Sequence, residues 1–203
     1  MVKYGEILRG CFRFQILIQL KSVSLLINFV EMIKRYPKTL SSGANNTVIA
    51  LSETEAGKLF VEDTRSEIGS EAEKMQFANA VNGLVVKFIR FDEYENADVL
   101  VMERLGPLDY RFFEMGKREL IFDVFEDELR QLHKAGFVHR DLRRPSNVPG
   151  MTFDNVFLTL SGIRLIDVGI SILKSKVSER LFNRAVEEEL KELEIFRQFF
   201  ITR

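Results

Sequence analysis

Apolar residues recur every three or four positions in several stretches of the chain, and this spacing predicts amphipathic helices. Long helices are expected over residues 14–35, 117–134 and 178–201, and a shorter one over residues 66–79. Gly136 follows the second of these and is typical of a helix C-terminus, because glycine adopts a left-handed backbone there without strain. The second half of the chain is therefore expected to be mostly helical.

Runs rich in β-branched and aromatic residues lie between these helices and predict strands. Residues 38–62 are expected to hold strands on both sides of a turn at residues 52–57. Residues 84–91 and 98–102 are expected to form a second pair around a turn at residues 92–97. The first half of the chain is therefore expected to be a small sheet.

Strands in the first half and helices in the second predict an α+β fold with two lobes, a small antiparallel-sheet lobe and a truncated, mostly helical lobe. We expect a helical extension over residues 1–36, the sheet lobe over residues 37–104 and the helical lobe over residues 105–203. Within the helical lobe, residues 156–158 and 163–166 are expected to pair as a hairpin around a Leu-Ser-Gly turn.

The charge balance excludes some functions and leaves others open. The 203 residues carry 29 Lys and Arg against 30 Asp and Glu, which gives a net charge of −1. Such a chain has no overall attraction for nucleic acid, which is not an expected partner. A single cysteine, Cys11, forms no intrachain disulfide and suits a reducing, cytoplasmic location. The apolar runs within residues 14–35 are too short to span a bilayer, so a packing helix is favoured there over peripheral membrane contact.

Two acidic residues and one amide stand out in the second half of the chain. Asp141 follows the end of a predicted helix, in the run His-Arg-Asp-Leu. Asn155 and Asp167 stand at the two ends of the predicted hairpin. Two carboxylates and one amide placed in this way are able to hold Mg²⁺ and to orient a hydroxyl group. Phosphoryl transfer needs little more from a protein than positioning and charge neutralisation.

The run His139-Arg140-Asp141-Leu142 resembles the catalytic loop of the protein-kinase-like superfamily, and Asp167-Val168-Gly169 resembles its metal-binding DFG element with Val in place of Phe. The resemblance implies that Asp141 is the base that accepts the proton of a substrate hydroxyl. It implies that Asp167 binds Mg²⁺ on the phosphates of ATP, that Arg140 belongs to the catalytic motif, and that an Asn holds a second metal ion.

The identity of that Asn has two candidates. The family pattern places it at Ser146, which lacks a suitable side chain, and Asn147 is one residue late. Asn155 is followed by Val-Phe-Leu-Thr, the kind of sequence that follows this Asn in the family, and its separation from Asp167 also fits the family pattern. We favour Asn155 over Asn147, which implies an insertion of roughly residues 143–154 in the catalytic loop.

Two further segments resemble the nucleotide-binding parts of the family. Residues 41–48 fit the register of the glycine-rich lid but keep only Gly43 and Val48 from its pattern. Residues 99–105 resemble the strand that leads to the hinge, in which backbone groups of Glu103 and Leu105 would meet the edge of adenine. The resemblance therefore implies ATP and Mg²⁺ as cofactors.

The lysine of the family's V-A-I-K strand is the main departure. The matching segment is read as residues 59–62, which places Glu62 where a cation is needed. A carboxylate there would repel the nucleotide and would face the glutamate, Glu71 or Glu73, that normally pairs with the lysine. Lys58 lies roughly 13 Å away along the strand and is not expected to reach. Lys74 and Lys87 are the other candidate substitutes.

The resemblance covers roughly residues 38–175, and few residues follow Gly169. Compact, atypical members of the superfamily, such as small bacterial effector kinases and lipopolysaccharide kinases, share this brevity. The expected function is transfer of the γ-phosphoryl group of Mg-ATP to a hydroxyl of a protein Ser or Thr, a small molecule or a glycolipid. The alternative is a pseudokinase that binds a protein partner or nucleotide without turnover, which Glu62, the eroded lid and Val168 favour.

Overall fold

The computed structural model describes residues 36–42, 46–60, 68–145 and 150–202. Predictions that fall on residues 1–35, Gly43, Glu62 or Asn147 therefore lie outside the described residues. Contacts divide the chain into two units at Lys38, and the second, Thr39–Arg203, is compact. All the described residues after Lys38 belong to the second unit, which contains every element of the candidate site.

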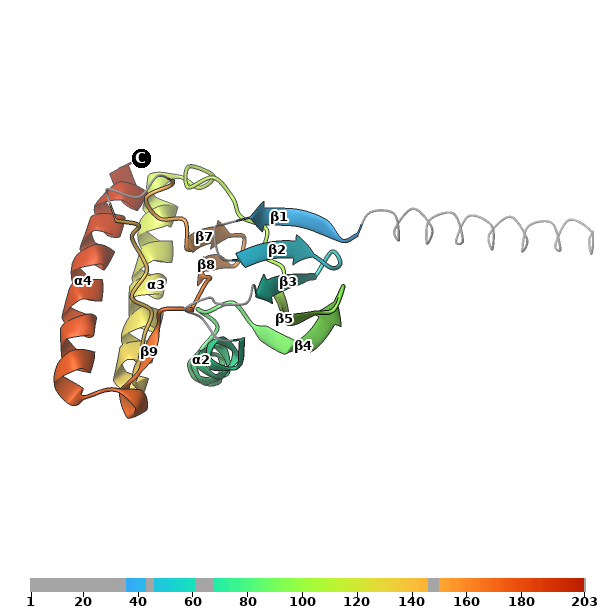
Figure 1. Cartoon of the computed structure of the whole chain (residues 1–203). Coiled ribbons are helices and arrows are strands. Elements are labelled where there is room, and N and C mark those ends of the chain that lie inside the picture. The colour runs from blue at the N-terminus through green and yellow to red at the C-terminus, as the bar shows by residue number, and fades with distance from the viewer. Residues whose placement is uncertain (1–35, 43–45, 61–67, 146–149, 203) are drawn as a thin grey trace, which may run out of the picture. The chain divides into compact units, whose positions relative to one another are not determined.

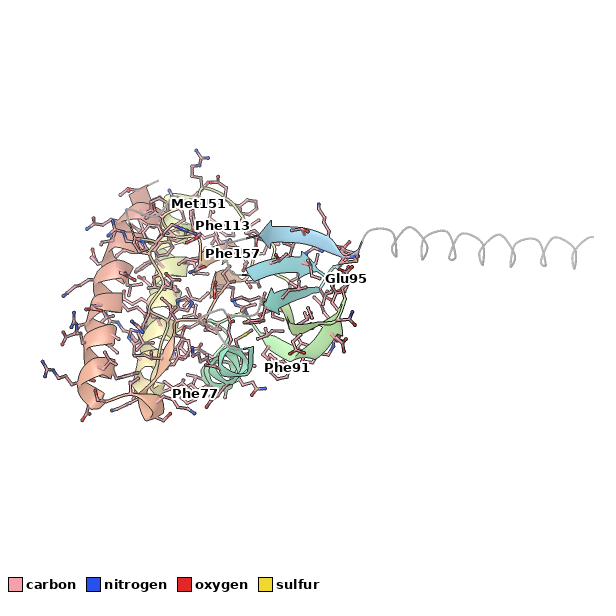
Figure 2. All side chains as sticks on the ribbon, viewed as in Figure 1. Phe77, Phe91, Glu95, Phe113, Met151 and Phe157 are labelled. Carbon is pink, nitrogen blue, oxygen red and sulfur yellow. The ribbon has the colours of Figure 1, made fainter. Side chains whose placement is uncertain are left out.

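One sheet of five strands occupies the first half of the second unit (Figure 1). The strands run in the order β1-β2-β3-β5-β4, and β2, β3, β5 and β4 pair antiparallel along that order. The α-helix of this half is α2, Ile68–Val81, which packs against β4 and β5. The strands are β1 (Lys38–Ser42), β2 (Asn46–Ala50), β3 (Glu55–Phe60), β4 (Phe88–Tyr94) and β5 (Ala97–Glu103). Figure 2 shows Glu95 at the tip of the β4–β5 hairpin, at the end of the sheet that points away from α3 and α4.

The second half is built around two long helices that lie side by side, α3 and α4 (Figure 1). The hairpin β7–β8 lies between α3 and the sheet, and the short strands β6 and β9 pair with each other. The elements are α3 (Met115–Ala135), β6 (Phe137–Val138), β7 (Val156–Thr159), β8 (Gly162–Leu165), β9 (Ile172–Leu173), a 3₁₀ turn (Lys174–Lys176) and α4 (Glu179–Thr202).

This arrangement confirms the predicted α+β class, with an antiparallel sheet first and a helical part after it, and it is consistent with a kinase-like fold. The helices predicted at residues 117–134 and 178–201 match α3 and α4 to within two residues. Gly136 caps α3 with φ of 107°, and its amide donates to the carbonyls of Leu132 and His133. Within the described residues, no helix combines the length and the apolar character that a membrane span needs.

The sheet and the helical part share one hydrophobic core. Leu84, Val85 and Val86 connect α2 to β4 and are fully or almost fully buried. The amide of Val86 donates to the Leu165 carbonyl, and the amide of Leu165 donates to the Leu84 carbonyl, both over 2.8 Å. The sheet is thereby fixed to β8, the strand that leads to Asp167.

The predicted turn at residues 52–57 is too long, because β3 begins at Glu55. The Ser52 hydroxyl accepts the amides of Thr54 and Glu55 and closes a connection of four residues, 51–54, between β2 and β3. Gly57 is a strand residue, not a turn residue. A Cβ at Gly57 would lie 2.7 Å from Val99 Cγ1, so the glycine allows β3 and β5 to pack closely.

Gly57→Ala is expected to lower the free energy of unfolding by about 1–3 kcal/mol, because the new methyl group overlaps a stiff, buried valine. Urea denaturation followed by circular dichroism measures the change. The control is Gly69→Ala in α2, where nothing lies within 4 Å of the added atom. It should leave the stability unchanged or raise it by about 0.5 kcal/mol. Equal losses in the two variants would contradict the close packing at Gly57.

Candidate active site

A buried lysine on β3 joins two carboxylates that come from distant parts of the chain. Lys58 Nζ lies 2.6 Å from Glu71 Oε1 on α2 and 2.8 Å from Asp167 Oδ1, which follows β8. The side chains of Lys58 and Glu71 are 5% and 2% exposed, whereas that of Asp167 is 45% exposed. One ammonium group therefore connects the sheet, its helix and the end of the hairpin.

The expectation that Lys58 is too far along the strand to reach the helix glutamate is wrong, because Lys58 contacts Glu71 as well as Asp167; Glu62 itself lies outside the described residues. The error came from assigning Glu55, Ala56 and Gly57 to a turn, which moved the start of the strand and the expected lysine position toward the C-terminus. In the structure, Lys58 pairs in register with Val48 on β2 and Leu100 on β5, near the middle of β3.

The structure also separates the other candidates at this position. Glu71 contacts Lys58, whereas Glu73 pairs with Lys176 at 3.0 Å. Lys74 donates to the Gly169 carbonyl at 2.7 Å, and Lys87 is exposed. Neither Lys74 nor Lys87 is therefore needed as a substitute for the strand lysine.

The charges of this cluster depend on one another. Burial alone lowers the pKa of Lys58, but the charges of Asp167 and Glu71 outweigh burial and the pKa is raised above its usual value. Burial opposes the charged form of Asp167 as well. The Lys58 ammonium and its hydrogen bond reverse that effect, so the pKa of Asp167 lies below its usual value. Lys58 is therefore protonated and Asp167 ionised at neutral pH.

The predicted catalytic loop places Asp141 beside Asn155. Asn155 Nδ2 donates to Asp141 Oδ2 at 2.8 Å and to the Asp141 carbonyl at 3.2 Å. Burial raises the pKa of Asp141, and the nearby charge of Asp167 raises it further, while His139 and the Asn155 hydrogen bond act in the opposite direction. The charge of Asp167 thus acts on the carboxyl group of Asp141.

Asn155 lies beside Asp141, whereas Asn147 lies outside the described residues, so the choice of Asn155 as the metal ligand stays a prediction. The described residues on either side of residues 146–149 are bonded to each other. The Arg144 amide donates to the Thr152 carbonyl at 2.8 Å, and the Arg144 side chain pairs with Asp154. The Phe153 ring packs against the rings of Phe196 and Phe199, so Phe153 contacts α4 directly.

The backbone on both sides of the site is held in an unusual conformation. Arg140 and Asp167 have φ of 70° and 56°, in the left-handed region that residues other than glycine rarely adopt. Arg140 donates its amide to Glu189 Oε1 on α4 at 2.6 Å. The fully buried His139 ring contacts the Ile166 carbonyl through Nε2 at 2.9 Å. The first bond ties the loop of residues 139–141 to α4, and the second ties it to the segment that carries Asp167.

Glu189 is a residue that the sequence analysis missed. It is 1% exposed and accepts a second hydrogen bond from His133 on α3. Its position was readable in the sequence, since Glu189 stands three residues after Val186 and four before Leu193, within the apolar spacing of α4. An acidic residue on an apolar helix face indicates a buried polar contact.

The segment expected to meet adenine is only partly available for that role. The Glu103 amide donates to the Lys87 carbonyl at 2.9 Å, so it is not free to bind a ligand. The Glu103 side chain pairs with Arg164 on β8, and Leu105 packs against the core. Val48 lies half-buried opposite Lys58, whereas Gly43 lies outside the described residues.

The residues present fit a magnesium ion that is held mainly by phosphates. Mg²⁺ usually takes one or two protein ligands and completes its shell with water and phosphate oxygens. Asp167 supplies a partly exposed carboxylate, and Asn155 has an amide oxygen besides the nitrogen that bonds Asp141. Within the described ranges, no group of three or more His, Cys, Asp or Glu is placed to hold a metal by itself.

Comparison with solved structures finds a likeness, whereas comparison of sequences finds none. No family model matches the sequence, and no curated protein is significantly similar to it. The chain is similar to the Cydia pomonella granulovirus kinase PK-1, with a TM-score of 0.49 and 17% sequence identity. The likeness covers 75% of this chain and 59% of that kinase, so the chain spans about three-fifths of its length. At this level of similarity, the assignment of the site depends on its own geometry.

Lys58→Met is expected to lower the free energy of unfolding by about 3–5 kcal/mol, because Glu71 is left buried without its cation. Adding Glu71→Leu should restore most of the loss, since both buried charges are then gone. Urea denaturation at neutral pH measures the free energy of unfolding of the wild type, of Lys58→Met and of the double variant. The control Lys176→Met breaks an exposed pair with Glu73 and should change stability by less than about 1 kcal/mol. Similar losses in the two lysine variants would argue against a buried pair.

Proposed function

We propose that the protein binds Mg-ATP against β3 and the loop of residues 139–141 and transfers the γ-phosphoryl group to a hydroxyl acceptor. The observation that carries the proposal is the cluster of Lys58, Glu71 and Asp167, with Asp141 and Asn155 beside it. These groups supply a fixed cation, a carboxylate for a metal ion and a separate carboxylate for a proton. Phosphoryl transfer requires that combination.

Lys58 is the group suited to the phosphates. An ammonium has three N–H donors, and two of them are used on Glu71 and Asp167. The third has no partner among the described residues and is suited to a phosphate oxygen, and the two carboxylates fix the direction in which it points. When bound, Mg²⁺ would neutralise phosphate charge beside Asp167 and Asn155.

Asp141 is the group suited to the acceptor. The hydrogen bond from Asn155 fixes its rotamer and leaves its other oxygen to accept a proton from a hydroxyl. Its raised pKa makes it a stronger base than an ordinary aspartate. The acceptor class is therefore an alcohol, which includes a protein Ser or Thr, a small molecule or the sugar of a glycolipid.

A pseudokinase was the alternative, and its main support was the acidic residue at the lysine position. Lys58 removes that support. Val168 in place of Phe is fully buried and packs in the shared core, so its side chain contributes to the fold rather than to the chemistry. We therefore propose catalysis in preference to a binding role, and the experiment below distinguishes the two.

Asp141→Asn should lower single-turnover phosphoryl transfer from Mg-[γ-³²P]ATP by about 10²–10⁴-fold, because the variant lacks the general base. Transfer is measured to water, to the protein itself and to casein. Binding of a non-hydrolysable Mg-ATP analogue, measured by calorimetry, should persist in this variant. Asp123→Asn on the exposed surface of α3 is the matched control and should behave as the wild type does.

Three outcomes are informative. Turnover that depends on Asp141 supports the phosphotransferase. Binding of the analogue with no transfer to any of the three acceptors would replace it with the pseudokinase. If the wild-type protein fails to bind the analogue at millimolar concentration, both functions are wrong.

A further inference from the structure

Helix α2 contacts the segment that carries Asp167 in two ways. Glu71 and Lys74 are three residues apart and lie on the same face of the helix. Glu71 bonds Lys58, which in turn bonds Asp167. Lys74 Nζ donates directly to the Gly169 carbonyl at 2.7 Å. The helix is therefore connected to this segment once through the lysine of β3 and once through a bond of its own.

The backbone of this segment depends on support from outside. Asp167 has φ of 56°, a conformation that a residue other than glycine keeps only where its surroundings hold it. Two bonds close the segment from within. The Gly169 amide donates to Asp167 Oδ1 at 3.3 Å, and the Ser171 amide donates to the Val168 carbonyl at 3.1 Å. Neither of these local bonds ties the segment to another element, so its position depends on donors from elsewhere.

Those donors come from two parts of the fold. The loop of residues 139–141 supplies His139, which contacts the Ile166 carbonyl through Nε2 at 2.9 Å, and Arg140, which donates to the Ile170 carbonyl at 3.4 Å. Helix α2 supplies Lys74. Among the described residues, Lys74 is the only side chain outside that loop that donates to a backbone carbonyl of residues 166–170.

The carboxylates nearest to Lys74 on its own helix pair with other lysines. Glu71 pairs with Lys58, and Glu73 pairs with Lys176. A hydrogen bond from a charged donor is shorter and stronger than one between neutral groups, and the partial burial of Lys74 reduces competition from water. The ammonium group therefore acts on the backbone at Gly169 and not on a charge of α2.

We infer that Lys74 is a positioning residue for Asp167, which it holds beside Lys58 through the Gly169 carbonyl. With this carbonyl fixed to α2, the left-handed turn at Asp167 keeps its carboxylate in contact with Lys58 and available to a magnesium ion. In its meaning for Mg²⁺ the inference rests on the proposed function, whereas the bond and its effect on the segment do not.

The first test is amide hydrogen exchange of the wild-type protein and Lys74→Met, followed by NMR. The Ser171 amide reports on the closed segment, and the Leu165 amide, which bonds the Leu84 carbonyl, reports on the fold around it. In Lys74→Met the Ser171 amide should exchange about 10–100-fold faster, which corresponds to the loss of one hydrogen bond from a charged donor. The Leu165 amide should keep its wild-type rate, because its partner is unchanged.

Lys176→Met is the matched control. It removes one positive charge from the exposed pair with Glu73, next to Lys74 in sequence, and should leave both amides at their wild-type rates. The inference is wrong if the Ser171 amide keeps its rate in Lys74→Met, or if the Leu165 amide accelerates equally. If Lys74→Met does not fold, the wild-type protein decides the matter. A scalar coupling across the hydrogen bond, between Lys74 Nζ and the Gly169 carbonyl carbon, is then expected, and its absence would overturn the inference.

The Mg²⁺ dependence of nucleotide binding is a second readout, which a merely structural role would not change selectively. Calorimetry measures binding of the non-hydrolysable ATP analogue at increasing Mg²⁺. Lys74→Met should need about 10–100-fold more Mg²⁺ for half-maximal binding, as is typical when a group that orients a metal ligand is removed. Affinity for the analogue without Mg²⁺ should stay unchanged, because Lys58 is retained. An equal loss with and without Mg²⁺ would contradict the inference.

This inference and the proposed function fail separately. A protein that binds no ATP analogue, but whose Ser171 amide exchanges faster in Lys74→Met, would contradict the proposed function and leave Lys74 as the residue that positions Asp167. Turnover of Mg-ATP together with unchanged Ser171 exchange in Lys74→Met would overturn this inference alone.

Discussion

The position of one ammonium group between two carboxylates determines how the site is assembled. Lys58 reaches Glu71 only if β3 is in its observed register and α2 packs against the sheet, and it reaches Asp167 only if β8 ends beside both. Without the ammonium group, Glu71 would be a buried charge with its cation missing, so the contact couples the register of β3 to the packing of α2. Close packing of β3 on β5 at Gly57 and the bonds of residues 84–86 to β8 provide the necessary alignment.

The helical half also holds the loop of residues 139–141, whose backbone is left-handed at Arg140. The left-handed backbone at Arg140 persists because Glu189 takes its amide and the buried His139 links the loop to Ile166. The rings of Phe196 and Phe199 on α4 also pack against Phe153 of the inserted segment. Helix α4 thus contacts this region in two ways. The Glu189 carboxylate accepts the Arg140 amide, and Phe196 and Phe199 pack against Phe153.

Much of this was predictable because its signals are local. The apolar spacing gave α3 and α4 to within two residues, and the runs at residues 139–142 and 167–169 indicated that two carboxylates meet. The lysine was missed because Gly57 is typical of a turn in sequence, and only the contact with Val99 shows why a strand needs it. The bond of the Glu103 amide to Lys87 was not predictable, since it depends on strand pairing that no local pattern encodes.

The most direct test of the central claim is chemical labelling of lysines with an acyl-phosphate derivative of ATP, followed by mass spectrometry. The reagent acylates a lysine that lies against the phosphates of bound nucleotide. We predict that Lys58 is labelled although its side chain is only 5% exposed, and that excess Mg-ATP abolishes the label. Labelling confined to exposed lysines such as Lys87, with no effect of Mg-ATP, would contradict a nucleotide site built on Lys58.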